Sequence, residues 1–332
     1  MLPSISILGA GSWGTALALQ AARNGCNTML WAHNPQHVLQ IDQAKANQRY
    51  LPGFSFPDNL HVTANLEEAV TTNQLILLAV PSHAFKKTLV AIKPFLSPES
   101  KICWASKGFD HETGLLLSEV VSSILGNTTP IAILSGPTFA VEVAAGLPTA
   151  LTITSETELL ANELSNILHN RLFRIYTSRD IIGVQVGGAC KNVLAIAAGI
   201  ADGLGFGANT RAALITRGLN EIMRLGIKLG GQADTFMGLT GLGDLILTCT
   251  DNQSRNRRFG LALGRGESRE QALLSIAQEV EGIGAAREAY LLAKRHQIEM
   301  PITEQVYKVL FEDLQPKLAV QNLLGRDQKP EI

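Results

Sequence analysis

Short runs of β-branched and apolar residues alternate with helical stretches through the first half of the chain. Continuous apolar runs bounded by turn residues are typical of strands that are buried on both faces of a sheet. Strands that alternate with helices indicate βαβ units and a parallel sheet. We therefore predict an α/β fold whose N-terminal part is a doubly wound, mostly parallel sheet. The runs cover residues 5–8, 28–31, 75–80, 102–105, 131–134, 150–154 and 173–176.

The sequence changes character near residue 180. Beyond this point the β-branched runs disappear, and Ala, Gly and Leu recur at helical spacing. A chain of 332 residues is long enough for two domains, and no Pro/Ser-rich linker separates the two halves. We predict a sheet domain over residues 1–180 and an all-helical domain over residues 181–332. Helices are expected at 180–203, 210–229, 271–277, 285–295 and 304–311.

Composition excludes several classes of protein. The hydrophobic fraction of 46% is too high for a disordered chain. The net charge of −1 provides no basic field for nucleic acid. Four cysteines stand far apart without any Cys/His cluster, which argues against a metal site and fits a reducing compartment. No secretory signal is visible, and the longest uncharged stretch, 121–141, is broken by Gly, Pro and polar residues. We expect a cytoplasmic protein without stable membrane insertion.

A glycine motif follows the first predicted strand and opens the first helix. The segment Gly9-Ala10-Gly11-Ser12-Trp13-Gly14 fits G-x-G-x-x-G, a pattern that is informative only in this strand–helix context. The first glycine permits a tight turn, the second lets a pyrophosphate approach the backbone, and the third lets the helix close on the strand. The sequence therefore predicts a Rossmann-type dinucleotide site. The alternative is an ordinary glycine-rich turn.

The end of the second predicted strand bears on the choice of cofactor. An enzyme strict for NAD carries an acid there that binds the ribose 2′-hydroxyl. Here Trp31 is followed by Ala32, His33 and Asn34, without a carboxylate. His33 and Asn34 can bind a hydroxyl group and would not repel a 2′-phosphate. We expect NADP or NAD, while the alternative for His33 is a plain surface residue.

Polar residues also follow two later strands, at the sheet edge where ligands bind in open α/β folds. Lys107 lies in Ser106-Lys107-Gly108 and would point a cation at this edge. In the segment 135–140, Pro137 is expected to begin a helix capped by Ser135, which would leave free N–H groups for an anion. The alternatives are a solvated lysine and a plain helix cap.

One lysine lies inside the long apolar helix predicted at 180–203. Lys191 shares a helical face with Gly187, Ala195, Ala198 and Asp202. The small residues on this face would let another backbone or a ligand come close. A buried ammonium group is costly without a partner or a purpose, and desolvation moves a lysine pKa towards the range useful for general acid/base catalysis. The alternative is an ion-paired or snorkelling lysine.

Two further segments carry candidate polar groups. The glycine-rich stretch 238–245 contains Asp244, which could orient Lys191 or bind a substrate hydroxyl. The stretch 248–258 is expected to be a basic loop in which Arg255, beside Ser254 and Asn256, can bind a phosphate. The alternatives are a turn with a capping aspartate and a solvated loop. A third stretch, 279–282, is expected to be a surface turn.

Together these segments resemble the bacterial NAD(P)-dependent sn-glycerol-3-phosphate dehydrogenase family, from residue 9 to about residue 325. The resemblance implies interconversion of glycerone phosphate and sn-glycerol 3-phosphate, which supplies phospholipid synthesis, and makes a homo-oligomer plausible. It implies that Lys191 is the catalytic proton acceptor and donor. The substrate residues that it implies are Lys107, Gly136, Thr138, Lys191, Asp244, Ser254, Arg255 and Asn256. The cofactor residues are Gly9, Gly11, Ser12, Trp13, Gly14, His33, Lys107, Ala140, Arg255 and Glu281.

Two other functions stay open on the sequence. A β-hydroxyacid dehydrogenase of related fold also carries Gly-x-x-x-Lys in a helix, as Gly187 and Lys191 do. That pattern, however, has Asn four residues after the lysine, where this chain has Ala195. A non-catalytic NAD(P)-sensing module is the second alternative, and it should lack a buried lysine paired with an acid.

Overall fold

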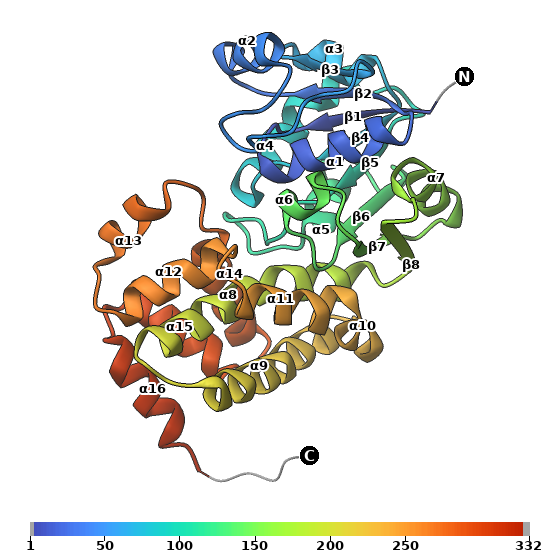
Figure 1. Cartoon of the computed structure of the whole chain (residues 1–332). Coiled ribbons are helices and arrows are strands. Elements are labelled where there is room, and N and C mark those ends of the chain that lie inside the picture. The colour runs from blue at the N-terminus through green and yellow to red at the C-terminus, as the bar shows by residue number, and fades with distance from the viewer. Residues whose placement is uncertain (1–2, 328–332) are drawn as a thin grey trace. The chain divides into compact units, whose positions relative to one another are not determined.

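The computed structural model describes residues 3–327 of the chain (Figure 1). The residues group into two compact units. Unit 1 comprises Met1–Asp110 and Leu115–Gln185, and unit 2 comprises His111–Gly114 and Val186–Ile332.

In the part of unit 1 that the structure describes, an eight-stranded sheet has the order β3-β2-β1-β4-β5-β6-β7-β8. All neighbouring strands are parallel except β6 and β7, which are antiparallel. The order 3-2-1-4-5-6 is that of dinucleotide-binding folds, in which the order reverses between β1 and β4. This confirms the predicted fold class. The strands are β1 (Ser4–Leu8), β2 (Asn27–Trp31), β3 (Leu60–Thr63), β4 (Leu75–Leu78), β5 (Lys101–Trp104), β6 (Ile131–Ser135), β7 (Thr149–Ser155) and β8 (Phe173–Ser178).

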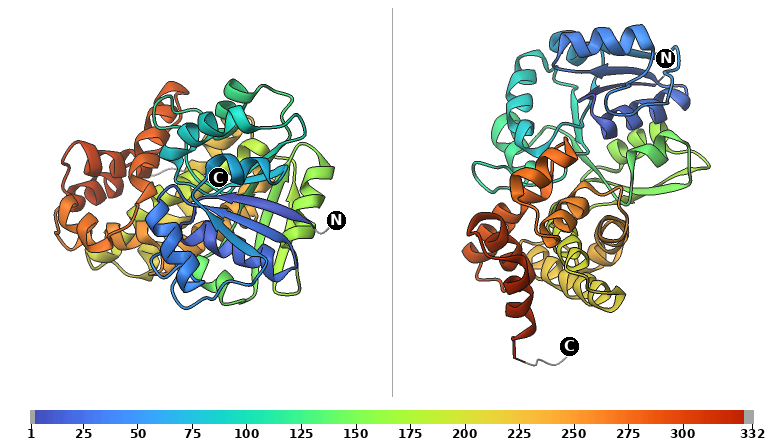
Figure 2. Two further views of the ribbon diagram at one scale, coloured as in Figure 1. Left: turned by 90° about the horizontal axis from the view of Figure 1, so that it is seen from above. Right: turned by 60° about the vertical axis from the view of Figure 1, so that its left-hand side comes forward.

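Helices cover both faces of this sheet, as Figures 1 and 2 show. Two hydrophobic clusters correspond to the two faces, and Leu77 of β4 belongs to one cluster while its neighbours Ile76 and Leu78 belong to the other. The strands are therefore buried on both sides, as their unbroken apolar runs predict. One face carries α1 (Ser12–Arg23), α2 (Pro35–Ala44), α6 (Ala140–Ala144) and α7 (Glu158–Leu168). The other carries α3 (Leu66–Thr71), α4 (Ser82–Ile92) with the short turn η1 (Lys93–Phe95), and α5 (Leu117–Leu125).

Two features of unit 1 differ from the sequence predictions. Strand β3 is missing from them because it has four residues, lies at the sheet edge and exposes His61, so it forms no apolar run. The predicted helix start at Pro137 is wrong. Ser135 is the last residue of β6, Gly136 has a φ of 154°, and α6 begins at Ala140. The N-terminal anion site expected at Pro137 is therefore absent from the described residues.

The described residues of unit 2 form helices and connecting turns without a strand, which confirms the all-helical prediction. The predicted basic loop 248–258 is wrong, because it contains the end of one helix and the start of the next. The predicted surface turn at Glu281 is also wrong, since Glu281 is the first residue of a helix. The elements are α8 (Ile181–Gly203, which begins in unit 1), α9 (Ala208–Lys228), α10 (Ala233–Met237), the π-helical turn η2 (Leu239–Gly243), α11 (Asp244–Thr250), α12 (Arg255–Gly264), α13 (Arg269–Ile276), α14 (Glu281–Arg295), α15 (Pro301–Phe311) and α16 (Pro316–Leu324).

Helix α8 is the long apolar helix predicted from the sequence. Its first turn is capped by Asp180, whose Oδ1 accepts a hydrogen bond from the backbone N–H of Gly183 at 2.8 Å. Within residues 3–327, this helix is the one that is long and apolar enough to cross a membrane. However, 89% of its most apolar window is buried inside the protein, as in a core helix.

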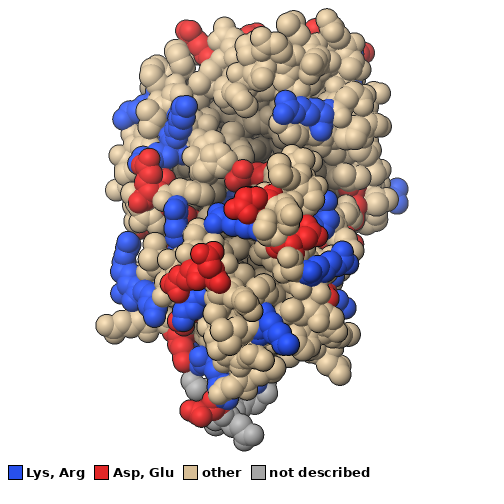
Figure 3. All heavy atoms as spheres, turned by 90° about the vertical axis from the view of Figure 1, so that its left-hand side faces the viewer, with Lys and Arg blue, Asp and Glu red and all other residues tan. Residues whose placement is uncertain are grey.

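Charge is mixed rather than polarised on the one face of the molecule that Figure 3 draws. On the face drawn in Figure 3, lysines and arginines alternate with aspartates and glutamates. This agrees with the balanced totals of 28 basic and 29 acidic residues. Any attraction for a phosphate must therefore come from a local group of side chains.

A buried carboxylate joins two helices of unit 2. Glu221 on α9 accepts hydrogen bonds from the backbone N–H groups of Ile302 (2.6 Å) and Thr303 (3.1 Å) and from the Thr303 hydroxyl (3.0 Å), in the first turn of α15. Burial raises the pKa of Glu221 from its ordinary 4.5 to about 7, although these hydrogen bonds and Arg224 act in the opposite direction. Glu221 therefore titrates near neutral pH in the folded protein.

Protonation of Glu221 should make stability depend on pH. Because the folded pKa lies above the unfolded one, the contribution is fully present below pH 4.5 and is lost as the pH rises through about 7. A shift of this size corresponds to roughly 3 kcal/mol of unfolding free energy. The Glu221→Gln variant cannot titrate at this position. The difference in urea-derived unfolding free energy, wild type minus variant, should fall between about pH 5 and about pH 8, and a difference that is constant with pH contradicts this.

Candidate functional site

The glycine loop between β1 and α1 has the backbone form that a dinucleotide requires. Gly9 has a φ of 123°, and a Cβ placed on it would lie 2.8 Å from the carbonyl oxygen of Ala79, just after β4. A Cβ on Gly14 would collide with the carbonyl oxygen of Gly9. A Cβ on Gly11, by contrast, would meet nothing within 4 Å. The loop is thus packed tightly on the sheet at Gly9 and Gly14 and open at Gly11, where a phosphate could approach.

A buried asparagine holds this loop in place. Asn47 Nδ2 donates hydrogen bonds to the carbonyl oxygen of Ala10 (2.9 Å) and to Thr15 Oγ1 (2.8 Å). Its Oδ1 lies 3.1 Å from His37 Nε2 on α2. Asn47 has no exposed surface, so these contacts fix the loop from behind. Asn47 cannot be found from the sequence alone, because an isolated Asn after a helix carries no distinguishing pattern.

Two buried polar atoms near the predicted cofactor residues have no hydrogen-bond partner within residues 3–327. They are Trp13 Nε1, in the first turn of α1, and Ser135 Oγ, at the end of β6. Buried polar groups normally find a partner, so these atoms are candidates to bind a ligand. Together with the open space at Gly11, they fit a bound dinucleotide.

His33 and Asn34 follow the end of β2, as predicted. His33 is exposed. Asn34 is the N-cap of α2, and its Oδ1 accepts a hydrogen bond from the backbone N–H of His37 at 3.1 Å. Aspartate is an equally good N-cap, so a negative charge can be introduced at residue 34 without loss of the cap.

The Asn34→Asp variant should shift cofactor preference towards NADH, because a carboxylate repels a 2′-phosphate. We expect the ratio of kcat/KM for NADPH to kcat/KM for NADH to fall about tenfold, equivalent to about 1.4 kcal/mol. The matched control is Asn65→Asp, because Asn65 caps α3 in the same way by accepting a hydrogen bond from the N–H of Glu68 at 3.2 Å. An unchanged ratio in Asn34→Asp, or an equal change in both variants, contradicts the prediction that the end of β2 meets the ribose 2′ position of the cofactor.

Three predicted substrate residues of unit 1 come together. Lys107 Nζ donates a hydrogen bond to the carbonyl oxygen of Gly136 at 3.2 Å, and Thr138 Oγ1 donates to the same oxygen at 3.2 Å. Residue 136 must be a glycine because of its positive φ and because of packing, since a Cβ would lie 2.9 Å from Leu151 Cα on β7. Ala140, the predicted cofactor contact, begins α6 four residues later.

Unit 2 contains a buried ion pair at the predicted catalytic lysine. Lys191 Nζ lies 2.5 Å from Asp244 Oδ1 and 2.9 Å from Thr248 Oγ1. Lys191 is 7% exposed and Asp244 is 1% exposed. The Thr248 hydroxyl donates in turn to the carbonyl oxygen of Asp244 at 2.6 Å. The ammonium group is therefore held in one position by two groups of a single helix, α11.

The backbone before Asp244 approaches α8 closely, as the small residues beside Lys191 predict. Residues Leu239–Gly243 form a π-helical turn, a conformation that is frequent at functional sites. A Cβ on Gly187, one turn before Lys191, would lie 3.2 Å from the carbonyl oxygen of Thr240. A Cβ on Gly241 would collide with the backbone of Phe236. These close contacts bring α11, and with it Asp244, against the lysine.

The start of α12 carries three of the predicted substrate residues. Ser254 is its N-cap, and Ser254 Oγ accepts a hydrogen bond from the N–H of Arg257 at 3.2 Å. Arg255 is the first helical residue and is partly exposed. Asn256 is 9% exposed, and it donates to Asn192 Oδ1 and accepts from the N–H of Gly282, both at 2.9 Å. Asn256 thus connects α8 and α12 to the first turn of α14, next to Glu281.

The predicted residues fall into two groups, one in each unit. Unit 1 contains Gly9, Gly11, Ser12, Trp13, Gly14, His33, Lys107, Gly136, Thr138 and Ala140. Unit 2 contains Lys191, Asp244, Ser254, Arg255, Asn256 and Glu281.

Two buried cysteines, Cys190 and Cys249, are the sequence neighbours of Lys191 and Thr248. Burial raises the pKa of Cys190 and of Cys249 to about 12 each, so both thiols stay protonated. Among the described residues, no three His, Cys, Asp or Glu side chains come together in a way that could hold a metal ion. The lysine and its hydrogen-bonded partners are the candidate groups for proton transfer at this position.

Comparison with known proteins identifies the family. The N-terminal family model of NAD-dependent glycerol-3-phosphate dehydrogenase matches residues 4–161, and the C-terminal model matches residues 180–321. The chain belongs to this family. The resemblance inferred from the sequence motifs is thereby confirmed.

Individual members of the glycerol-3-phosphate dehydrogenase family match along nearly their whole length. Glycerol-3-phosphate dehydrogenase [NAD(P)+] of Aeromonas hydrophila is 55% identical over 99% of this chain and 98% of its own. The enzyme of Methylococcus capsulatus is 57% identical over 98% of both chains. The crystal structure of glycerol-3-phosphate dehydrogenase from Coxiella burnetii is 48% identical, with a TM-score of 0.95 over 98% of this chain and 99% of that one.

Two side chains of this glycerol-3-phosphate dehydrogenase family member belong with the candidate site but are not among the residues predicted from the sequence. Thr248 stands four residues after Asp244, a spacing that places both on one face of a helix. Because the segment that starts at Thr248 is predicted as a loop, the sequence does not indicate that Asp244 and Thr248 share a helix face. Asn192 follows Lys191 directly, but its contact with Asn256 joins residues 64 positions apart.

Proposed function

We propose that the protein catalyses the NAD(P)H-dependent interconversion of glycerone phosphate and sn-glycerol 3-phosphate. The observation that carries the proposal is the buried pair of Lys191 and Asp244, 2.5 Å apart, in a chain whose other unit has a dinucleotide-binding loop. The names of the relatives support the choice of substrate. A non-catalytic NAD(P)-sensing module would have no use for a buried lysine–aspartate pair.

Lys191 acts as the general acid in reduction and as the general base in oxidation. A nicotinamide cofactor, when bound, would supply or accept the hydride at the carbon that carries the reacting oxygen. When the carbonyl is reduced, the Lys191 ammonium donates a proton to the carbonyl oxygen, and in the reverse direction the amine takes the hydroxyl proton. Asp244 and Thr248 orient Nζ and stabilise its charged form by hydrogen bonds of 2.5 and 2.9 Å.

Arg255 holds the phosphate of the substrate. A phosphate ester carries about −2 charge at neutral pH by analogy with phosphorylated side chains. The planar guanidinium can bind two of its oxygens at once. The other proposed substrate residues are Lys107, Gly136, Thr138, Lys191, Asp244, Ser254 and Asn256. The proposed cofactor site is the glycine loop with Ser12 and Trp13, together with His33, Lys107, Ala140, Arg255 and Glu281.

Further proposals follow from the family. Residues 1–180 form the NAD(P)-binding domain and residues 181–332 the substrate-binding and catalytic domain. The product supplies glycerophospholipid synthesis in the cytoplasm. The protein forms a homo-oligomer, which light scattering of the purified protein tests directly.

A substrate panel tests the proposed reaction against its alternative. Purified protein with NADPH should reduce glycerone phosphate, and it should leave oxo acids, the substrates of β-hydroxyacid dehydrogenases, essentially unchanged. The product should be the sn-glycerol 3-phosphate enantiomer. Reduction of an oxo acid in preference to glycerone phosphate would favour the alternative, and no turnover of any carbonyl compound would favour the sensing module.

A further inference from the structure

Helices α8 and α12 cross with their backbones in direct contact. Near the crossing, a Cβ on Gly199 would collide with the carbonyl oxygen of Arg257, and a Cβ on Gly260 with that of Ile196. One turn further along, a Cβ on Gly264 would collide with the carbonyl oxygen of Ile200. Glycines alone, however, only permit a close approach. They leave the finer orientation of the first turn of α12, where Arg255 and Arg257 stand, to be set by side chains.

A buried ion pair provides such a restraint next to the crossing. Asp202, in the last turn of α8, accepts a hydrogen bond from Arg257 Nη1 at 2.5 Å and from Arg211 Nη1 at 2.7 Å. The side chains of Asp202 and Arg257 are 10% and 8% exposed, whereas that of Arg211 is 30% exposed. Arg257 Nε is buried and has no hydrogen-bond partner within residues 3–327. The guanidinium of Arg257 is therefore restrained chiefly by Asp202.

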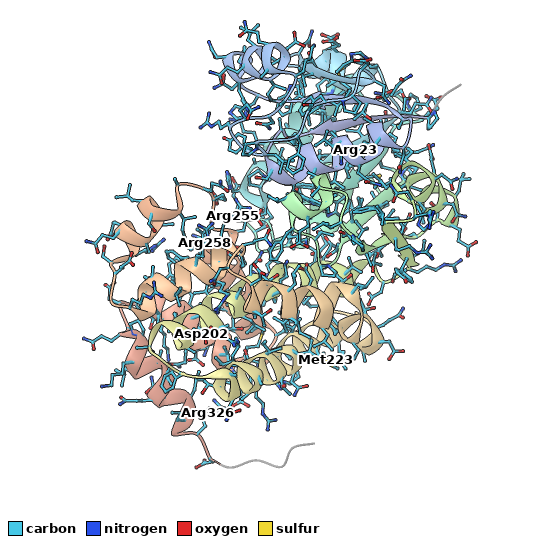
Figure 4. The ribbon with its side chains drawn as sticks, viewed as in Figure 1. Arg23, Asp202, Met223, Arg255, Arg258 and Arg326 are labelled. Carbon is cyan, nitrogen blue, oxygen red and sulfur yellow. The ribbon has the colours of Figure 1, made fainter. Side chains whose placement is uncertain are left out.

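Arg257 stands two residues after Arg255 in the first turn of α12. Successive residues of an α-helix are turned by about 100° around its axis, so these two side chains point in nearly opposite directions. Asn256, between them, is held by Asn192 and Gly282. Figure 4 shows Arg255 at the start of α12 and Asp202 near the end of α8. The contact of Arg257 with Asp202 on one side of this turn therefore helps to set the direction of Arg255 on the other side.

We propose that Asp202 is a positioning residue for phosphate binding, which acts through Arg257 to set the direction of Arg255. The proposal rests on the proposed function, because it assigns Arg255 to the substrate phosphate. Without the ion pair, the first turn of α12 loses its tether to the last turn of α8, and Arg255 loses its alignment. Lys191, Asp244 and Thr248 lie on α8 and α11 and keep their contacts.

The Asp202→Asn variant tests this by separating binding from chemistry. We expect KM for glycerone phosphate to rise about tenfold, with kcat and KM for NADPH within about threefold of wild type, because misalignment of an anchor mainly weakens binding. The dissociation constant of sn-glycerol 3-phosphate, measured by calorimetry in the presence of NADP, should rise by a similar factor. The matched control is Arg211→Gln, which leaves the pair of Asp202 and Arg257 intact and should change KM less than about twofold.

A second variant removes the risk that an unpaired buried charge simply unfolds the protein. The double variant Asp202→Asn with Arg257→Gln removes both charges. Because glutamine is shorter than arginine, its amide cannot restore the contact between α12 and the end of α8. KM for glycerone phosphate should again rise about tenfold.

The results separate the inference from the proposed function. An unchanged KM in both variants, or a parallel loss of kcat and of NADPH binding, overturns the role of Asp202 while wild-type activity stands. A wild type that does not turn over glycerone phosphate instead contradicts the proposed function, and the inference falls with it.

Discussion

Replacing Lys191 by alanine should lower kcat for glycerone phosphate by about 10²- to 10⁴-fold, the usual contribution of a general acid or base. The affinity for NADPH should stay near the wild-type value, because the predicted cofactor loop lies in unit 1. Steady-state kinetics and fluorescence titration with NADPH measure the two quantities. Turnover within a few-fold of wild type would mean that Lys191 is structural.

Two variants show whether the loss is chemical. Lys191→Ala leaves the carboxylate of Asp244, 1% exposed, without its cation, and breaking a buried pair can cost about 3–5 kcal/mol of stability. Lys191→Arg keeps a cation in place but cannot exchange a proton at neutral pH, so it should also be inactive while it remains folded. Small primary amines should restore part of the activity of Lys191→Ala. Lys101→Ala, which removes a half-buried ion pair with Glu163 (2.7 Å), should retain its activity.

Replacing Arg255 by alanine should raise KM for glycerone phosphate about 10- to 100-fold, in line with about 1.5–3 kcal/mol for a hydrogen bond to a charged group. The value of kcat should fall less, because anchoring is needed equally in the ground and transition states. Arg255→Lys should recover part of the loss, since an ammonium is a point charge rather than a planar fork. Initial rates over a range of substrate concentrations give both constants.

Arg258 provides the matched control for Arg255. It lies three residues further along α12, is exposed, and is labelled beside Arg255 in Figure 4. Arg258→Ala removes the same charge and should leave KM nearly unchanged. Unphosphorylated glycerone should be a poor substrate for wild type and for Arg255→Ala alike. If Arg255→Ala loses activity equally on both substrates, the phosphate site must lie elsewhere, around Lys107 and Thr138.

The sheet of unit 1 could be predicted because most of its strands have a local sequence pattern of their own. A strand buried on both faces needs apolar residues at successive positions, as Ile76, Leu77 and Leu78 show, and each run ends at turn residues. Strand β3 could not be found in this way because an edge strand tolerates polar residues such as His61. The start of α6 cannot be predicted locally, because Ser135-Gly136-Pro137 satisfies a capping pattern while pairing with β7 keeps Ser135 in the sheet.

In unit 2, the sequence indicates which residues matter but not how they are held. Lys191 stands out because an ammonium in an apolar helix needs a partner. Its partners Asp244 and Thr248 are 53 and 57 residues away. The glycines that allow the close approach do not reveal it, because a glycine is equally common in turns and at helix ends. The stretch around Arg255 has the composition of a loop, so α12 was not predicted. The contact of Arg257 with Asp202 depends on that helix and cannot be derived without it.

Isotope transfer from the cofactor tests the central claim most directly. The protein is incubated with glycerone phosphate and NADPH that carries deuterium at the transferable position of the nicotinamide, and the product is analysed by mass spectrometry and NMR. If the protein is a glycerol-3-phosphate dehydrogenase acting by hydride transfer, one deuterium should appear on the carbinol carbon of sn-glycerol 3-phosphate. Glycerol 3-phosphate without deuterium at that carbon, or no glycerol 3-phosphate at all, would contradict the account.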